Sequence, residues 1–402
     1  MHSAIDLSKE RLRLPAAANV LAWAFGVLGL LGLAASFWLG YRSPEGPSHV
    51  LHSYLVSLAF FLSIALGALF FVILQHATRA GWSVVLRRIA EIVAANIPIL
   101  ALLAIPVAIG IHHLYHWADP AAVAGDQLLR EKSPYLNPSF FVLRLLAYFA
   151  LWSALSTYYL RASLKQDQSG DATLTLRMQR LGAPALLLYG ITVTFASFDL
   201  LMSLDPHWFS TIYGVYFFAG GVVGFFALLP LVIYVLQRSG YAAHAITIEH
   251  YHDMGKLLFA FVVFWAYIAF SQYMLIWYGN MPEETDWYFD RQAGGWAWVS
   301  LALLFGHFIV PFLAVLSRVP KRSKALLAGV ALWVLAMHWI DLYWLVMPGA
   351  EGHPVLPGLA DLACTVGIGG LLVAATVLRM RRHALIPVGD PRLDESRRFE
   401  NA

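Results

Sequence analysis

The chain has 402 residues, of which 59% are hydrophobic and only 13% are charged, and its formal net charge is +3. Because soluble domains carry roughly 25% charged residues, this composition excludes a soluble protein and indicates a polytopic helical membrane protein. The single cysteine, Cys364, excludes an internal disulfide. The chain alone also cannot supply the four or so ligands of an iron–sulfur cluster, and it lacks the Cys-x-x-Cys-His motif of c-type haem attachment.

Ten apolar runs are long enough, at about 20 residues each, to cross a bilayer. Lipid offers no water to open backbone groups, so each run is predicted to be helical. We expect the first run to be a retained helix rather than a cleaved signal peptide. Pro98 and Pro106 are expected to kink the third run, and Pro311 the eighth. The runs lie at 17–40, 50–76, 85–112, 138–162, 176–200, 209–236, 254–279, 293–317, 325–347 and 357–379.

The lysines and arginines predict the orientation of these spans. With the N-terminus placed in the cytoplasm, 22 of the 27 basic residues, Lys9 among them, fall in inside segments, and Arg144 lies within the fourth span. The bias has the same sign at every loop, so the positive-inside rule predicts that both termini are cytoplasmic. Only four basic residues fall outside: Arg42, Arg130, Lys132 and Arg291.

The stretch from His250 to Thr285 is a predicted span with an unusual set of polar residues. At about 100° per residue, seven of its residues fall on one face and rise about 27 Å, nearly the hydrocarbon thickness. Such a face is expected to line a protein interior. We call this set the polar stripe: Asp253, Lys256, Ala260, Phe264, Tyr267, Ser271 and Tyr278.

Other ionisable residues also lie inside predicted spans, at different depths. Ordered by depth they predict two half-channels that meet near mid-membrane and conduct protons. A bundle held together by structural polar contacts would give the same pattern. Arg144 needs a carboxylate or carbonyl partner, and Asp199 and Asp341 are the candidates. The proton-path candidates are Glu91, Asp253 and Lys256 near the cytoplasmic side, His307 near the middle, and His338, Asp341 and Asp199 toward the outside.

Some spacings allow more specific contacts. Asp253 and Lys256 are three residues apart and can form an ion pair, and the same spacing lets Asp341 orient the imidazole of His338. The histidines at 112, 113 and 116 suit a membrane interface better than a metal site, so we expect no metal. His307 and His338 could hold a b-type haem only if their spans align. No phosphate-binding loop or nucleophile elbow is present.

Three sequence strings resemble a known family: SFDLLMSLDPHWFSTIYGVYFFAGG (197–221), HDMGKLLFAFVVFWAYIAFSQYMLIWYGNMPEET (252–285) and HFIVPFLAVLSR (307–318). They are similar to alternative complex III, a quinol:cytochrome c oxidoreductase, and within it to the second NrfD-like, polysulfide-reductase-like membrane subunit (ActF). The strings cover about a fifth of the chain, and the ten-span pattern covers most of it.

The resemblance implies two four-helix bundles, formed by spans 2–5 and 6–9, with spans 1 and 10 at the periphery. The expected partners are a sister NrfD-like membrane subunit, an iron–sulfur protein and c-type cytochromes, in a bacterial inner membrane and with no nucleic acid. This chain would bind no cofactor alone, with quinol as a candidate ligand. The expected division is 1–16 (cytoplasmic segment), 17–40 (peripheral helix), 50–200 and 209–347 (bundles), 357–379 (peripheral helix) and 380–402 (cytoplasmic tail).

These observations predict a structural and proton-conducting membrane subunit of a respiratory quinol-oxidising complex, with no catalytic residue of its own. One rival is a passive scaffold without proton transfer. Another is a quinol-binding catalytic subunit, whose site would lie in an outer pocket near His207, Trp208, Asp199 and Arg144. A solute transporter is a third rival. Whether this chain contributes directly to an enzymatic step stays open at this point.

Overall fold

The computed structural model describes residues 10–42, 46–349 and 355–401, so Lys9 and the remainder of 1–9 lie outside the described residues. In the described part of the chain there is no β-strand, only an isolated bridge between Arg11 and Tyr241. Within these described ranges, ten helices are long and apolar enough to cross a membrane. The expected fold class, an all-α multi-pass membrane protein, is therefore confirmed.

Eight of the ten expected spans are single, continuous helices, and two are interrupted. The continuous spans are α1 (Ala18–Arg42), α2 (Gly46–Ala77), α9 (Pro138–Ser169), α10 (Ala172–Leu200), α11 (Tyr213–Arg238), α12 (Ile248–Gly279), α17 (Lys324–Val346) and α18 (Leu359–Arg382). The third is divided into α3 (Val84–Ala94), α4 (Ile97–Leu103) and α5 (Ile105–Ile109), followed by the short α6 (Ile111–Leu114). The eighth consists of α14 (Trp296–Ala302), a π-helix η4 (Leu303–Ile309) and α15 (Val310–Ala314).

The interruptions occur where prolines were expected to disturb the helices. Pro98, Pro106 and Pro311 each lie in the first turn of the segment that follows a break. Proline has no backbone N–H and its ring clashes with the preceding turn, so a new segment begins there. The π-helix before Pro311 was not predicted. Single turns of this kind occur frequently at functional sites.

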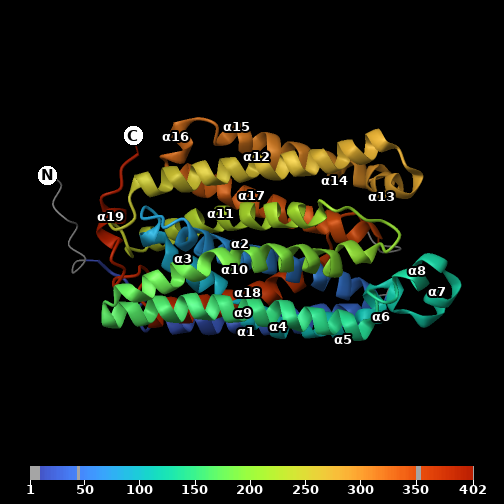
Figure 1. Cartoon of the computed structure of the whole chain (residues 1–402), viewed down its shortest axis with the longest axis horizontal. Coiled ribbons are helices and arrows are strands. Elements are labelled where there is room, and N and C mark those ends of the chain that lie inside the picture. The colour runs from blue at the N-terminus through green and yellow to red at the C-terminus, as the bar shows by residue number, and fades with distance from the viewer. Residues whose placement is uncertain (1–9, 43–45, 350–354, 402) are drawn as a thin grey trace.

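Helix contacts organise the spans around the α2–α11 pair. On one side α2 packs with α3, α4, α9 and α10; on the other side α11 packs with α12 and α17, and η4 contacts both of these helices. These are the two four-helix bundles that the resemblance implied. Helices α1 and α18 pack closely on each other and both contact α2 (Figure 1). In α2, 89% of the most apolar stretch is buried, compared with 17% in α1, so α2 is central and α1 is peripheral.

Glycines allow the peripheral pair to pack closely. A Cβ atom on Gly32 would lie 2.8 Å from the backbone nitrogen of Gly367, and one on Gly29 would lie 2.7 Å from that of Leu371. Backbone atoms cannot move aside as side chains can. A larger residue at either position would therefore separate α1 from α18.

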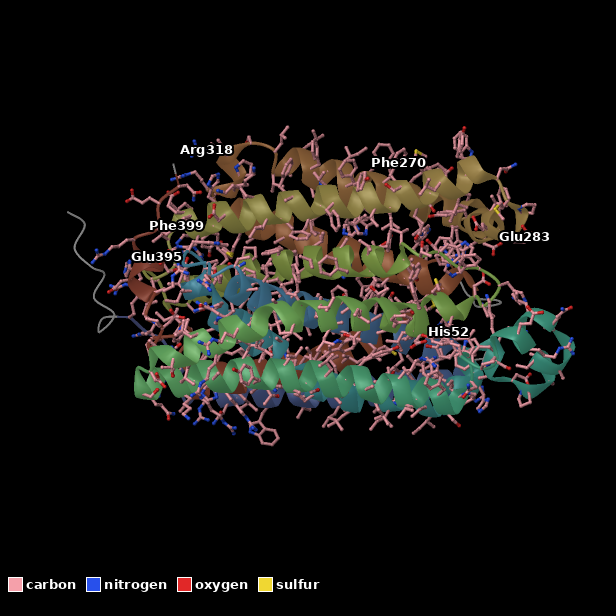
Figure 2. The ribbon with its side chains drawn as sticks, viewed as in Figure 1. His52, Phe270, Glu283, Arg318, Glu395 and Phe399 are labelled. Carbon is pink, nitrogen blue, oxygen red and sulfur yellow. The ribbon has the colours of Figure 1, made fainter. Side chains whose placement is uncertain are left out.

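The two ends of the described chain lie at the same end of the bundle. The N–H of Leu385 donates to the carbonyl of Leu12 (2.7 Å), and that of Leu14 donates to the carbonyl of Met380 (3.3 Å). In Figure 2, Arg318, Glu395 and Phe399 mark this end, and Glu283 marks the opposite one. The arrangement agrees with the prediction that both termini share one side of the membrane.

The polar stripe of α12 does not line the interior, and this expectation was wrong. Tyr267 is 63% exposed and Tyr278 is 84% exposed, and Lys256 is also exposed. The buried face of α12 instead carries Trp265 and Gln272. The stripe was assumed to avoid lipid because it is polar. However, most of its members are aromatic or small residues that tolerate the outer face of a bundle.

Candidate functional site

A cluster of polar side chains lies buried where the second bundle meets α2. Tyr216 comes from α11, Trp265 from α12 and His307 from the π-helix η4, while α17 contributes two residues and α2 one. All are 5% exposed or less. We call this set the central cluster: Ser63, Tyr216, Trp265, His307, His338 and Asp341.

His338 reaches α2 across a gap that glycine leaves on α11. Its Nε2 lies 2.9 Å from the hydroxyl oxygen of Ser63. A Cβ atom on Gly224 would lie 2.8 Å from Cδ2 of the His338 ring, and one on Gly220 would lie 3.0 Å from its Cε1. The imidazole therefore fits between α2 and α11 because these two residues have no side chain.

His307 has no hydrogen-bonding partner for either ring nitrogen among the described residues, although it is fully buried. Its ring centroid lies 4.0 Å from that of Trp265 and 6.1 Å from that of His338. Nδ1 of His338 also has no partner in the described chain. A buried polar nitrogen without a partner destabilises a fold by about 1–3 kcal/mol, so three at one point indicate a site for water or for protons.

Asp341 accepts hydrogen bonds from two aromatic donors. The Tyr216 hydroxyl donates to one carboxyl oxygen, and Nε1 of Trp265 donates to the other at 3.2 Å. Asp341 therefore does not orient His338 through a hydrogen bond, contrary to the expectation from their spacing. The two side chains leave the same face of α17, but Ser63 is the hydrogen-bonding partner of His338.

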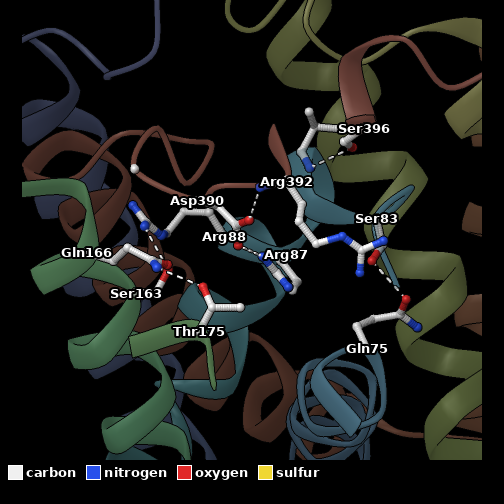
Figure 3. A network of polar contacts seen from close by, with 12 residues as sticks. Gln75, Ser83, Arg87, Arg88, Ser163, Gln166, Thr175, Asp390, Arg392 and Ser396 are labelled. Atoms are coloured by element: carbon white, nitrogen blue, oxygen red, sulfur yellow. Dashed lines mark hydrogen bonds and ion pairs between the residues drawn. The ribbon is translucent and has the colours of Figure 1, made fainter. Parts of the chain in front are cut away.

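A second buried group lies at the end of the bundle that carries the chain termini (Figure 3). Glu91 accepts a hydrogen bond from Nε of Arg88 at 3.0 Å, and Arg88 also pairs with Asp167 of α9 at 2.8 Å. The neighbouring Arg87 pairs with Asp390 of the C-terminal tail. The positive-inside prediction counted both arginines among the cytoplasmic-side charges, and in the structure both are buried. Glu91 is thus held in an ion-pair network, and one of its oxygens has no partner in the described residues.

His76 is a further buried histidine that the sequence reasoning did not single out. It lies in the last turn of α2, stacks on Tyr159 with 5.3 Å between ring centroids, and has no partner in the described residues for either ring nitrogen. From Ser63 to His76 the axis of α2 rises about 20 Å. Between them α2 carries apolar residues as far as Leu74. The inner groups and the central cluster are therefore separate.

Asp253 and Lys256 form the expected ion pair at the inner end of α12, and Lys256 also donates to Asn401 at 2.6 Å. Lys256 is exposed, whereas Asp253 is buried. Along the helix axis Asp253 lies about 18 Å and Lys256 about 14 Å from Trp265 of the central cluster. The structure thus brings His307, His338 and Asp341 together, but it places Glu91 and the Asp253–Lys256 pair at the far end.

Arg144 and Asp199 pair with each other at the outer end of the first bundle, so the expected carboxylate partner of Arg144 is Asp199. Nε and Nη2 of Arg144 each donate to one carboxyl oxygen at 2.9 Å, and Tyr148 donates at 2.8 Å. Nη1 donates to the carbonyl of Tyr135. All the strong contacts of Asp199 are thus within the first bundle, away from the central cluster.

The outer loops enclose a pocket of about 1070 Å³ beside His207 and Trp208. His207 lies 2.5 Å from Asp126, and Trp208 stacks on Trp287 with 4.3 Å between ring centroids. Asp199 and Arg144 do not line this pocket, although Tyr135, which does, contacts Arg144. The four quinol-site candidates are therefore split between the pocket and the buried pair behind it.

No group of three or more histidine, cysteine, aspartate or glutamate side chains within the described ranges is arranged to hold a metal ion. Nδ1 of His112 lies 2.8 Å from the carbonyl of Ala118, within its own loop. A comparison with models of protein families found no match for the chain, and no curated protein matched it.

Proposed function

We propose that this chain is an integral membrane subunit of a respiratory quinol:cytochrome c oxidoreductase of the alternative complex III type, and that it conducts protons. The electron carriers belong to its partners: an iron–sulfur protein and c-type cytochromes, with a sister NrfD-like subunit beside it in a bacterial inner membrane. Quinol oxidation releases protons, and the chain provides part of their path. The three sequence strings carry the family assignment.

The observation that carries the proton-conducting role is the unpartnered His307. An imidazole can take up a proton on one nitrogen and release one from the other, provided that both nitrogens are free to exchange partners. His338 and Asp341 supply a second imidazole and a carboxyl group within the same cluster. The π-helix places His307 there, and π-helical turns are rare and occur frequently at functional sites. Ordered water is required to connect the cluster to either side.

The exposed polar stripe of α12 supports the proposal of a membrane partner. Tyr267 and Tyr278 face outward on α12, whose other face is buried in the bundle. Polar groups at membrane depth usually face protein rather than lipid. A helix of the sister subunit against this face would give them partners.

The test uses the complex purified through a tag on this chain. The subunit list must contain cytochrome and iron–sulfur proteins; a chain that purifies without them contradicts the family assignment. In the assembled complex, His307→Gln and Asp341→Asn are expected to lower the protons released per quinol oxidised. Asp394→Asn, at a 70% exposed carboxylate, is the control. A full complement of subunits with an unchanged proton ratio in both variants would contradict proton conduction by this chain.

The outer pocket beside His207 favours quinol binding by this chain as a second candidate function. Its volume of about 1070 Å³ suits a ring head group, and Trp208, Trp287 and His207 provide stacking and hydrogen-bonding groups. A Trp208→Ala variant would then raise the KM for quinol. An unchanged KM in a fully assembled complex contradicts this candidate.

A further inference from the structure

A second pocket, of about 860 Å³, opens on the lateral face of the second bundle. It lies between α12 and the interrupted eighth span, and Trp344 of α17 and Tyr216 of α11 contribute to its lining. From Val263 to Tyr273 it follows α12 for about 15 Å. Its rim is exposed where membrane lipid would lie: Phe270 is 60% exposed and Leu304 is 48% exposed. Figure 2 shows Phe270 on the outward side of α12.

The outer end of this pocket holds an arginine with no acidic partner. Arg291 ends α13 (Pro282–Gln292) and is 3% exposed. Its guanidinium donates to three backbone carbonyls, those of Trp287 (2.9 Å), Leu345 (3.0 Å) and Trp344 (3.3 Å). No carboxylate lies within 4 Å of it in the described residues. Burial lowers the pKa of Arg291 to about 10, so it remains charged at neutral pH.

Carbonyls do not neutralise this charge, and they do not use all of its donors. A guanidinium has five N–H groups. Three are used in the hydrogen bonds above, which leaves one on each terminal nitrogen without an acceptor in the described chain. One face of the guanidinium is covered by the Trp287 ring at 3.4 Å. The remaining donors suit a fork-shaped contact with two oxygens of an anion.

The rest of the pocket is apolar and aromatic. Its walls are built from side chains such as Phe270, Leu301, Leu304 and Phe308, together with small residues at Ala266 and Ala269. An occupant must therefore combine a negative head at the Arg291 end with an apolar tail that reaches mid-membrane. Quinones have a tail but an uncharged head, so they do not compensate Arg291.

We propose that this pocket binds an anionic phospholipid, with its phosphate on Arg291 and one acyl chain along α12. The bound chain lies against Tyr216 and Trp265, the two residues that donate hydrogen bonds to Asp341. The acyl chain therefore separates the central cluster from the surrounding membrane lipid. This inference does not depend on the proposed function, since it concerns only a charge and a cavity.

The experiment measures lipid retained by the purified chain, with whatever subunits accompany it, by native mass spectrometry. Phosphatidylglycerol and phosphatidylcholine are offered at equal concentration. We expect the unmodified protein to retain phosphatidylglycerol, and Arg291→Gln to lose the preference by about tenfold, the size expected for a charge-assisted hydrogen bond. Ala266→Phe fills the pocket without touching Arg291 and is expected to lower retention of both lipids.

Two matched controls make the result decisive. Arg130→Gln removes an exposed charge from the outer loops, and Ala150→Phe adds a ring to the exposed face of α9; neither is expected to change retention. Equal retention of both lipids by the unmodified protein would overturn the proposal. So would full retention of phosphatidylglycerol by both pocket variants, or a quinone or a partner helix found in the pocket instead.

Discussion

The two bundles treat their buried polar groups differently. In the first bundle Arg144 has Asp199, and Arg88 has Asp167 and Glu91, so each buried cation has a carboxylate partner. The imidazole of His76, also in the first bundle, has no hydrogen-bonding partner among the described residues, but it stacks on Tyr159 and lies apart from the central cluster. In the second bundle His307, equally without a partner in the described chain, lies beside His338. Paired charges at fixed distances hold helices in register. Imidazole nitrogens without partners do not fix the register of helices. They contribute to function only when water or a proton binds to them.

This comparison predicts that replacements in the first bundle damage folding, whereas replacements in the second damage function. The largest expected effect is that of Arg144→Met. It leaves Asp199 buried with only Tyr148 as a donor, and loss of one member of a buried pair destabilises by about 3–5 kcal/mol. We expect little assembled protein and a lower melting temperature in detergent. Arg130→Gln, at an exposed arginine, is the control. Equal melting temperatures for the two variants would contradict the predicted difference between the bundles.

The second prediction concerns the space that Gly224 leaves for His338. Gly224→Val would place its Cβ 2.8 Å from the ring, so His338 must move away from Ser63. Overpacking of this kind destabilises by about 1–3 kcal/mol. Unfolding in detergent measures the loss. Gly190→Val, on α10 where a Cβ meets nothing within 4 Å, should have little effect.

The third prediction tests the difference between paired buried charges and the unpartnered imidazole of His307. His307→Phe removes two buried nitrogens without partners, so the free energy of unfolding is expected to stay within about 1 kcal/mol of the unmodified protein or to rise. Proton release per quinol should nevertheless fall. The exposed His244 provides the control, His244→Phe, which should change neither quantity. A strongly destabilised His307→Phe would make the histidine structural.

The smallest effect is expected at the exposed pair of Asp126 and His207. The hydrogen bond from His207 lowers the pKa of the Asp126 carboxyl below its ordinary value. A lowered pKa in the folded state stabilises the fold above the ordinary carboxyl pKa, and this stabilisation is lost as the pH falls through the lowered value. Asp126→Asn should therefore melt slightly lower at neutral pH. The difference should begin to shrink near pH 3.9, the ordinary aspartate value, and vanish below the lowered pKa of the folded state; a difference that grows on acidification contradicts the assignment.

Much of the fold could be predicted because lipid imposes simple rules. The ten spans follow from length and hydropathy, and the breaks at Pro98, Pro106 and Pro311 follow from the missing N–H of proline. Arg144 and Asp199 could be paired because a buried arginine needs a carboxylate.

The site was harder to predict, since it depends on which face each helix buries. Polarity alone placed the stripe of α12 inside, whereas Trp265 on the opposite face donates to Asp341. The π-helix under His307 left no recognisable sequence pattern. Arg88 was counted among the cytoplasmic-side charges because its position near a basic segment could not show that Asp167 and Glu91 pair with it. Asp290 precedes Arg291 in the sequence, so the sequence could not show that no carboxylate pairs with the Arg291 guanidinium.

The C-terminal tail, residues 384–401, does more than extend from the last span. Ser396 donates to the carbonyl of Trp82 and accepts from the N–H of Val85, while its own carbonyl lies 3.1 Å from Nε2 of His250. It thereby connects the α2–α3 turn of the first bundle to α12 of the second. A ribosome delivers this residue after all ten spans. The tail can therefore form these contacts only once both bundles are inserted and adjacent. Formation of the Ser396 contacts is thus expected to be a late step of assembly.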